Sequence, residues 1–198
     1  MRTSLLLWMM LLVGLFSSCQ DETSVSEPEE HAEKVANTAY SILDANIEYD
    51  PSYYSIPYPN GDIPKDKGVC TDVVIRTYRK LGIDLQELVH LDMKDNFHVY
   101  PKNWGLNRTD TNIDHRRVPN LMKFFSRHGQ VKRITERLSD YHVGDIVAWD
   151  LGNGITHIGI VSNIKDEKGR SKIIHNIGSG QVLEDVLFRW KVIGHYAY

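Results

Sequence analysis

Apolar residues recur at helical spacing through the first two thirds of the chain and at a spacing of two through the last third. Helical spacing starts near Glu29, runs from Cys70 to Leu81, resumes after Asp84, and returns from Pro119 to His128. Alternation with a period of two then marks four short segments, DIVAWDL, THIGIVSNI, SKIIHNI and WKVIGHYAY. Helices followed by strands predict an α+β domain, in which N-terminal helices pack on a C-terminal antiparallel sheet.

The residues between these segments predict how the elements begin and connect. Asp84 is the expected N-cap of one helix, whose inward-facing residues should be Leu85, Leu88 and Val89. The segment KDEKGR at 165–170 is the clearest hairpin connection. The segments 49–68 and 100–117 show no period, and loops this long inside a domain are often functional.

The first 33 residues are predicted to lie outside the folded domain. Residues 1–18 read as a signal peptide, since their apolar run is too short to span a bilayer. The run ends on Cys19 and resembles a bacterial lipobox, which implies a lipidated cysteine and a disordered tether over 19–33. The folded domain would then occupy 34–198. The protein would be exported and lipid-anchored in a bacterial cell envelope, on the periplasmic or outer-membrane side. A plain signal peptide with an incidental Cys19 is the alternative.

Charge and cysteine content narrow the function. A formal net charge of -3 gives no sign of a nucleic-acid partner, and no glycine-rich phosphate motif is present. The chain has two cysteines, so a lipidated Cys19 leaves Cys70 as a lone thiol. A disulfide between Cys19 and Cys70 is the competing structural account.

Cys70 stands at the start of a predicted helix, in GVCTDVVIRTYRKLG. Free backbone N–H groups there favour a thiolate and could also hold a developing oxyanion. Asp72, two residues later, would oppose a thiolate. An activated Cys70 therefore requires either a histidine that outweighs Asp72 or a carboxylate that points elsewhere.

His157 and His175 are the histidines expected to be buried, one on each of two neighbouring strands. If these strands pair through the 165–170 turn, the two rings can be cross-strand neighbours, and one can orient the other. A nucleophile, a general base and a residue that orients the base are the three members of a catalytic triad. The alternatives are core histidines without a chemical role, or a metal site that adds Cys70 and a carboxylate. No local ligand cluster supports the metal site, so we expect neither a metal nor a cofactor.

Three segments together resemble the papain-like cysteine peptidases of the NlpC/P60 superfamily: GVCTDVVIRTYRKLG, the strand entry YHVGDIVAWD, and the pair THIGIVSN and KIIHNIG. From about residue 40 to the C-terminus the chain is still more similar to the bacterial DUF1287 family, through GVCTDVVIRTYRKLGIDL, NIDHRRVPNL, GDIVAWDL and HNIGSG. The resemblance implies a papain-like fold, with Cys70 as nucleophile, His157 as base and His175 as orienting residue. Asn176 is the second candidate for the orienting role.

The sequence departs from the peptidases in two places. Val69 and Thr71 flank the cysteine where Asp and Ser are usual, and the insertion through Trp104 and DHRR has no counterpart. Arg116 in that insertion could bind a substrate carboxylate. Alternatively, it and Arg117 pair with nearby acids such as Asp110 and Asp114. The residues expected to contact substrate are Tyr58, Asp72, Arg116 and Trp149. Tyr53, Tyr54 and Tyr58 could equally pack the 49–68 loop onto the core.

The resemblance implies an envelope-anchored cysteine amidase or peptidase that acts on peptidoglycan stem peptides. Its partners would be the cell-wall peptide and the membrane. Two other functions remain open from the sequence. One is a lipoprotein that binds cell-wall peptides without cleaving them, and the other is an acyltransferase that uses the same triad.

Overall fold

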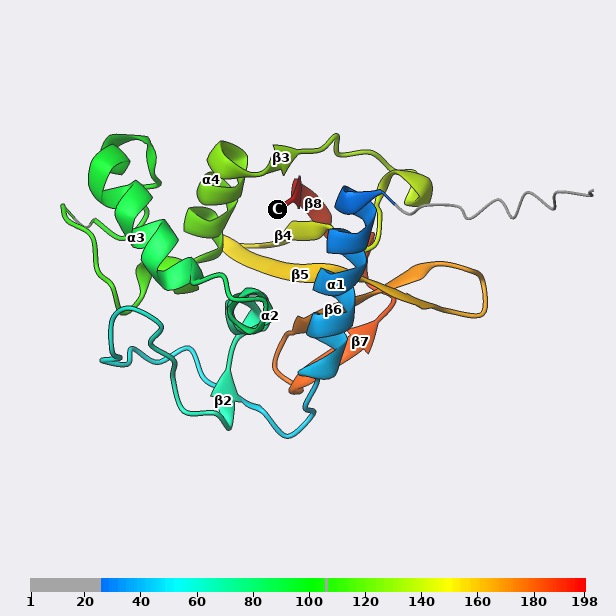
Figure 1. Ribbon diagram of the computed structural model, residues 1–198, viewed down its shortest axis with the longest axis horizontal. Coiled ribbons are helices and arrows are strands. Elements are labelled where there is room, and N and C mark those ends of the chain that lie inside the picture. The colour runs from blue at the N-terminus through cyan, green and yellow to red at the C-terminus, as the bar shows by residue number, and fades with distance from the viewer. Residues whose placement is uncertain (1–25, 106) are drawn as a thin grey trace, which may run out of the picture.

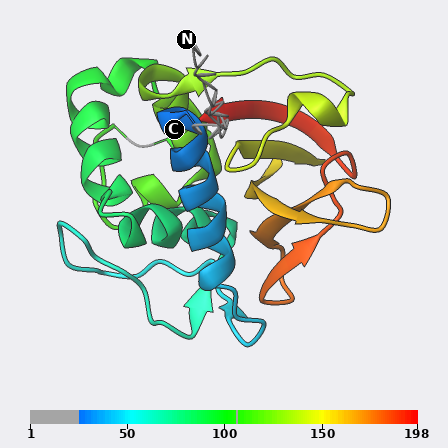
Figure 2. The same cartoon turned by 45° about the vertical axis from the view of Figure 1, so that its right-hand side comes forward.

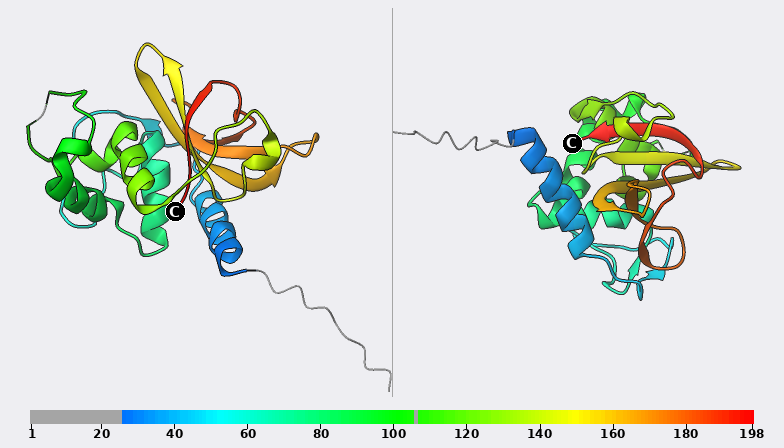
Figure 3. Two further views of the ribbon diagram at one scale, coloured as in Figure 1. Left: turned by 90° about the horizontal axis from the view of Figure 1, so that it is seen from above. Right: turned by 90° about the vertical axis from the view of Figure 1, so that its right-hand side faces the viewer.

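Apart from α1 (Glu27–Ser41), which packs against the strands, the helices lie to one side of the six-stranded sheet, as the view from above shows (Figure 3). The structure is a computed structural model that describes residues 26–105 and 107–198. The predicted signal peptide and Cys19 lie outside the described residues. Within the described part of the chain, no helix has the length and apolar character needed to cross a membrane.

The first helix corrects the predicted domain boundary. Residues 27–33, expected to belong to a disordered tether, form the N-terminal half of α1 (Glu27–Ser41). Pro28 and three glutamates in the first turn suit a helix start, because proline lacks the N–H that would be unpaired there and negative charge favours the N-terminus. α1 buries Val35, Ala36 and Ala39. It packs against both α2 and β5, and Figure 2 shows it between the other helices and the strands.

The three other predicted helices are confirmed as α2 (Cys70–Lys80), α3 (Leu85–Asn96) and α4 (Val118–His128). The Asp84 carboxylate accepts a hydrogen bond from the Gln86 amide, so the predicted cap is also confirmed. The inward orientation of Leu88 was wrong, because α3 buries residues spaced by four, and Leu88 is exposed at its flank. The buried residues of that row are Leu85, Val89 and Met93.

A six-stranded antiparallel sheet forms the second layer, in the order β3-β8-β4-β5-β6-β7 (Figure 1). The four predicted strands are β4 (Ile146–Gly152), β5 (Ile155–Lys165), β6 (Ser171–Asn176) and β8 (Lys191–Ala197). The predicted hairpin at 165–170 joins β5 to β6. The sequence pattern missed β3 (Gln130–Val131) and β7 (Gln181–Glu184), which are too short to show alternation.

Short elements organise the two long loops. β1 (Glu48–Tyr49) and β2 (Lys67–Gly68) pair in parallel and bring the ends of the 49–68 loop together just before α2. The 100–117 segment contains a single turn of 3-10 helix, η2 (Asp114–Arg116). Two further such turns are η1 (Phe97–Val99) and η3 (Leu138–Asp140).

The sheet carries a buried cluster on each face. Ile158 and Ile160 of β5 belong to the first cluster, which also contains Cys70 and the buried faces of the helices. Val161 of β5 belongs to the second cluster, together with Trp149 of β4. Successive side chains of a strand point to opposite faces, so this division fixes the side on which each candidate residue of β5 lies.

Candidate active site

Cys70 is the first residue of α2 and is 5% exposed. It is a free cysteine. The Val69 amide, which precedes it, donates to the Asp72 carboxylate at 2.7 Å and so closes the helix start. The predicted position of the thiol at a helix N-terminus is therefore confirmed, but the thiol is more buried than a solvent-accessible nucleophile would be.

The surroundings of the sulfur favour the neutral thiol. Burial raises the pKa of Cys70 to about 12, and the negative charge of Asp72 adds to this. Backbone amides act in the opposite direction by favouring a thiolate, first that of Ile158 and then those of Thr71 and Cys70 itself. The resting protein therefore holds a neutral thiol, with backbone donors placed where an anion would form.

His157 and His175 form a pair, as the sequence predicted. Nε2 of His157 lies 2.9 Å from Nδ1 of His175, and the ring centroids are 5.0 Å apart. On its other side, Nε2 of His175 is 3.4 Å from a carboxylate oxygen of Glu184 on β7. These contacts place the two rings and the carboxylate in one row across three strands.

Burial keeps both imidazoles neutral. It lowers the pKa of His157 to about 3, and the neighbouring His175 lowers it further. Burial also lowers the pKa of His175, which the Glu184 carboxylate partly offsets. A neutral imidazole is the form that can accept a proton. A pKa this low also makes His157 a weak base at neutral pH, so a role as general base requires its pKa to rise when substrate binds.

Trp149 supports this pair and does not reach solvent. It lies opposite His157 in the β4–β5 ladder, and its ring centroid is 5.6 Å from that of His157. Its indole N–H donates to the Leu187 carbonyl at 2.8 Å, and its side chain is fully buried. Trp190 stands across both histidine rings. The prediction that Trp149 contacts substrate is wrong for this state, because the indole forms the wall behind His157.

The thiol and the imidazoles approach the same stretch of β5 from opposite faces. Cys70 shares the first cluster with Ile158, whereas the preceding residue, His157, packs with Trp149 on the face of the second cluster. A Cβ added at Gly159 would meet Ile173 and the Cβ of His175, which confirms the face of this row. Between residues 26 and 198, apart from the undescribed position 106, no hydrogen bond joins the sulfur to either ring. The structure thus pairs the two histidines, and it packs Cys70 in the cluster of the adjacent residue, Ile158, without a hydrogen bond to either ring.

The contact of Asn176 with Gly68 shows why His175 of β6 contacts His157 and Asn176 does not. The side-chain amide of Asn176 donates to the Gly68 carbonyl at 3.3 Å, on the side of the sheet where α2 begins. His175, one residue earlier, therefore points to the other face. Of the two candidates for the orienting role, His175 is the one that contacts His157.

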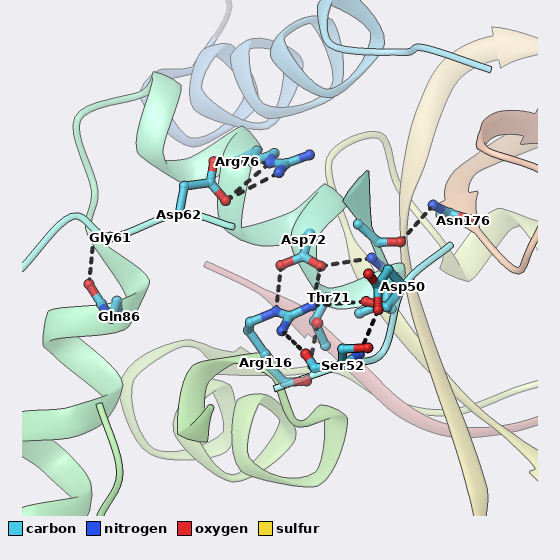
Figure 4. Close-up of polar contacts among 12 residues, drawn as sticks. Asp50, Ser52, Gly61, Asp62, Thr71, Asp72, Arg76, Gln86, Arg116 and Asn176 are labelled. Carbon is cyan, nitrogen blue, oxygen red and sulfur yellow. Dashed lines mark hydrogen bonds and ion pairs between the residues drawn. The ribbon is translucent and has the colours of Figure 1, made fainter. Parts of the chain in front are cut away.

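Asp72 and Arg116 do not face a substrate, because they bind each other. Nε of Arg116 donates to Asp72 at 3.0 Å and Nη2 donates at 3.1 Å, and both side chains are 2% exposed (Figure 4). Both predicted substrate contacts are therefore wrong. The alternative that local acids pair with the two arginines holds for Arg117, which is 3.5 Å from Asp114. For Arg116 the partner is Asp72, 44 residues away, and neither Asp110 nor Asp114.

The tyrosines of the 49–68 loop mainly hold the loop in place. Tyr54 donates to Asp50, and Tyr53 donates to Asp110 of the insertion. Tyr58 is 40% exposed and packs edge-on against His90 of α3, so its predicted contact with substrate stays a prediction. Tyr49 was missed by sequence reasoning. Burial raises the pKa of Tyr49 to about 12, and a thiolate on Cys70 and the carboxylate of Asp72 also act to raise it, so its hydroxyl lies in their neighbourhood.

No sequence signal singled out Tyr49. It shares the loop with several other tyrosines, and only the β1–β2 pairing brings it beside α2.

The described ranges contain a large cavity but no cluster of metal ligands. No group of three His, Cys, Asp or Glu side chains in these ranges is arranged to hold a metal ion. A cavity of about 850 Å³ lies near the start of α1 and the end of α4, and none of the three candidate catalytic residues lines it.

Comparison with known proteins shows the family. The model of the family described as "Domain of unknown function (DUF1287)" matches residues 36–198. The chain belongs to this family. The matched residues 36–198 include Cys70, His157, His175 and the Asp72–Arg116 pair. A curated relative, "Uncharacterized protein YijF" of Escherichia coli (strain K12), is 51% identical over 164 residues, which cover 83% of this chain and 80% of the relative.

Among solved structures, the chain is similar to "Structure of NlpC2 from Trichomonas vaginalis", with a TM-score of 0.44 and 18% identity. The match covers 84% of this chain and 46% of that chain, so this protein spans under half the length of its structural neighbour. A likeness this distant does not establish a shared activity. The mixed architecture of helices packed on an antiparallel sheet rests on the structure itself.

Proposed function

We propose that this DUF1287 protein is a cysteine-dependent amidase or peptidase. The observation that carries the proposal is the 2.9 Å contact between Nε2 of His157 and Nδ1 of His175, next to Ile158, which shares a buried cluster with Cys70. A nucleophile at a helix N-terminus, a neutral imidazole and a second group that orients it are the parts that thiol hydrolysis needs.

The contacts of His175 favour one arrangement of protons. The Glu184 carboxylate lies 3.4 Å from Nε2 of His175 but forms no hydrogen bond with it in the structure. The nearby negative charge favours a proton on that nitrogen of the neutral ring. Nδ1 of His175 is then an acceptor, and Nε2 of His157 must donate to it. This leaves Nδ1 of His157 with a lone pair, and among the described residues it has no other partner. A general base for Cys70 would use that nitrogen.

The proposed reaction follows from these roles. The sulfur attacks an amide carbonyl carbon while its proton passes to Nδ1 of His157, and that proton then goes to the leaving amine. Backbone N–H groups at the start of α2 would hold the oxyanion. Water then hydrolyses the thioester and regenerates the thiol. In the resting state the thiol and the ring are buried on opposite faces of β5. The reaction therefore requires β5 to rearrange near His157 when substrate binds, so that the ring reaches the face of the sulfur.

The substrate and the location are further parts of the proposal. The resemblance to cell-wall peptidases favours a peptidoglycan stem peptide as substrate. The lipobox-like residues ending at Cys19 favour attachment to a membrane of the bacterial envelope. In α1 the chain leaves the domain directly at Glu27, so fewer residues separate a lipid on Cys19 from the domain than the sequence predicted.

The direct test is amide release from purified peptidoglycan by the wild type, Cys70→Ala and His157→Ala. Both variants should lose activity by at least about 10²-fold, since each removes a reacting group. The exposed His98 supplies a matched control, because His98→Ala should leave the rate unchanged. Full activity in folded Cys70→Ala would exclude Cys70 as the nucleophile.

Burial of the site favours one other function, a lipoprotein that binds cell-wall peptide without cleaving it. A neutral thiol with a raised pKa and two fully packed histidines are also what a structural core would contain. Titration of a purified muropeptide into the wild type separates the two functions. Saturable binding with no product by mass spectrometry would favour the binding protein, and release of new amines would favour the hydrolase.

A further inference from the structure

Asp72 and Arg116 form a buried ion pair directly beside the candidate nucleophile. Asp72 belongs to the first turn of α2, two residues after Cys70, and Arg116 ends the 3-10 turn η2 of the 100–117 insertion. The guanidinium meets the carboxylate with two donors, at 3.0 and 3.1 Å. Figure 4 shows these two side chains pointing toward each other beneath the start of α2. A planar fork of this kind fixes distance and direction together.

Arg116 also joins three segments that are far apart in the sequence. Its remaining donors reach the backbone carbonyls of Ser52 at 3.2 Å and of Asp50 at 3.4 Å, both in the loop that follows β1. Its own carbonyl accepts from the hydroxyl of Thr71 at 3.2 Å, next to Cys70. The insertion, the 49–68 loop and the nucleophile helix therefore meet at one guanidinium.

Asp72 lies where its negative charge disfavours a thiolate on Cys70, and the positive charge of Arg116 can reduce this effect. The carboxylate closes the helix start by accepting from Val69, so it cannot turn away, and its charge opposes a negative charge on Cys70. The other ionisable groups around the thiol offer no positive charge: Tyr49 from β1 is neutral, and burial lowers the pKa of the histidines on β5 and β6. Arg116 is the cation that pairs with Asp72 within the described ranges.

We propose that Arg116 is a positioning residue for Cys70: by pairing with Asp72 it offsets part of the carboxylate charge and holds the first turn of α2 in the conformation that permits a thiolate. This inference rests on the proposed role of Cys70 as nucleophile. It gives the insertion a function, which is to support the nucleophile from behind. It also accounts for an aspartate at a place where an uncompensated negative charge would slow catalysis.

The test measures the reactivity of Cys70 itself and needs no substrate. The rate of iodoacetamide modification of Cys70 is followed from pH 7 to 10.5 in the intact protein, by mass spectrometry of the peptide that contains it. Arg116→Met should slow modification at each pH by about tenfold, because a nearby unpaired carboxylate shifts a pKa by one unit or more. Asp72→Asn should accelerate it, and the double variant should return toward the wild-type rate.

Arg76→Met is the matched control, because Arg76 lies on the same helix and pairs with Asp62 nearer the surface. Its rate should stay within about twofold of wild type. An unchanged pH profile in folded Arg116→Met would overturn the proposal and leave a purely structural ion pair. If Arg116→Met does not fold, Asp72→Asn decides alone, and a rate no faster than wild type overturns the proposal. Loss of hydrolysis without any of these shifts would concern the proposed function and not Arg116, because modification reports only on the thiol.

Discussion

Nε2 of His157 lies 2.9 Å from Nδ1 of His175, and the planes of the two rings stand at 80° to each other. Two neutral imidazoles can share this contact only if one donates and the other accepts. The Glu184 carboxylate, 3.4 Å from Nε2 of His175, favours a proton on that nitrogen. With Nε2 of His175 protonated, Nδ1 accepts and Nε2 of His157 donates.

Removal of Glu184 should therefore change the tautomers of both histidines. In the wild type we expect protons on Nε2 of His157 and Nε2 of His175, and in Glu184→Ala a mixture of tautomers in both rings. Long-range nitrogen–proton NMR spectra of the ring atoms measure this distribution directly. Glu167→Ala, in the β5–β6 hairpin, is the control and should leave it unchanged. A wild type with the proton on Nδ1 of His157 would contradict the proposed base.

The stability of the fold should decrease as the pH falls below about 6.5. Burial lowers the pKa of His157 and of His115 to about 3, so protons bind the unfolded chain first. Stability is therefore fully present above the unfolded pKa of about 6.5 and is lost as the pH falls toward the folded value. Between pH 7.5 and 5.5, each such histidine should remove about 1.4 kcal/mol from the free energy of unfolding.

Urea denaturation at pH 7.5, 6.5 and 5.5 measures this loss. In His157→Gln and in His115→Gln, the decrease in the free energy of unfolding between pH 7.5 and 5.5 should be smaller than in the wild type by the contribution of the histidine removed. This should hold whatever the stability of each variant at pH 7.5. The exposed His98 should contribute nothing, so His98→Gln serves as the control. Stability that stays constant over this range would show that these rings accept protons in the folded state.

The regular elements near the site could be predicted because their signals are local. Asp84 marks the start of one helix, and alternation marks the strands that hold His157 and His175. The contact between those histidines followed from one further inference, that the 165–170 turn joins adjacent strands. Each step used neighbours in sequence or a single hairpin.

The partners of Asp72, Arg116 and Trp149 could not be predicted in the same way. The partner of Asp72 lies 44 residues away, in a segment without a period, and a charged residue by itself does not reveal its counterion. Trp149 has the composition of a binding residue, but the β4–β5 register places it behind His157. The separation of thiol and imidazole by the sheet also depends on which face of β5 the helices cover, and sequence alternation does not specify that choice.

Cys70 in the resting protein should react slowly with iodoacetamide at pH 7. Burial raises the pKa of its thiol to about 12, so the thiolate fraction is far below that of a free cysteine. The rate should rise about tenfold per pH unit up to pH 10 or above. Protein unfolded in urea is the control and should react at the rate of a free thiol. Rapid modification of folded protein at pH 7 would show that the thiol is already activated without substrate.

Gly159 should tolerate no side chain, because it lies where β5 and β6 approach each other beneath the histidine pair. A Cβ at this position would lie 2.8 Å from Cγ2 of Ile173, 2.9 Å from the Ile174 carbonyl oxygen and 3.1 Å from Cβ of His175. The carbonyl belongs to the strand ladder and cannot move independently. Gly159→Ala should therefore lower the free energy of unfolding by about 1–3 kcal/mol, as overpacking does in cores.

The same substitution should also disturb the site, since His175 would have to move away from His157 to make room. Amide release should fall by more than the loss of folded protein explains, and the ring signals of both histidines should shift in NMR spectra. Ile155→Ala, on the same strand but 59% exposed, is the control and should change stability by no more than about 0.5 kcal/mol. Wild-type stability together with unshifted ring signals in Gly159→Ala would mean that β5 and β6 lie farther apart at this point than the structure places them.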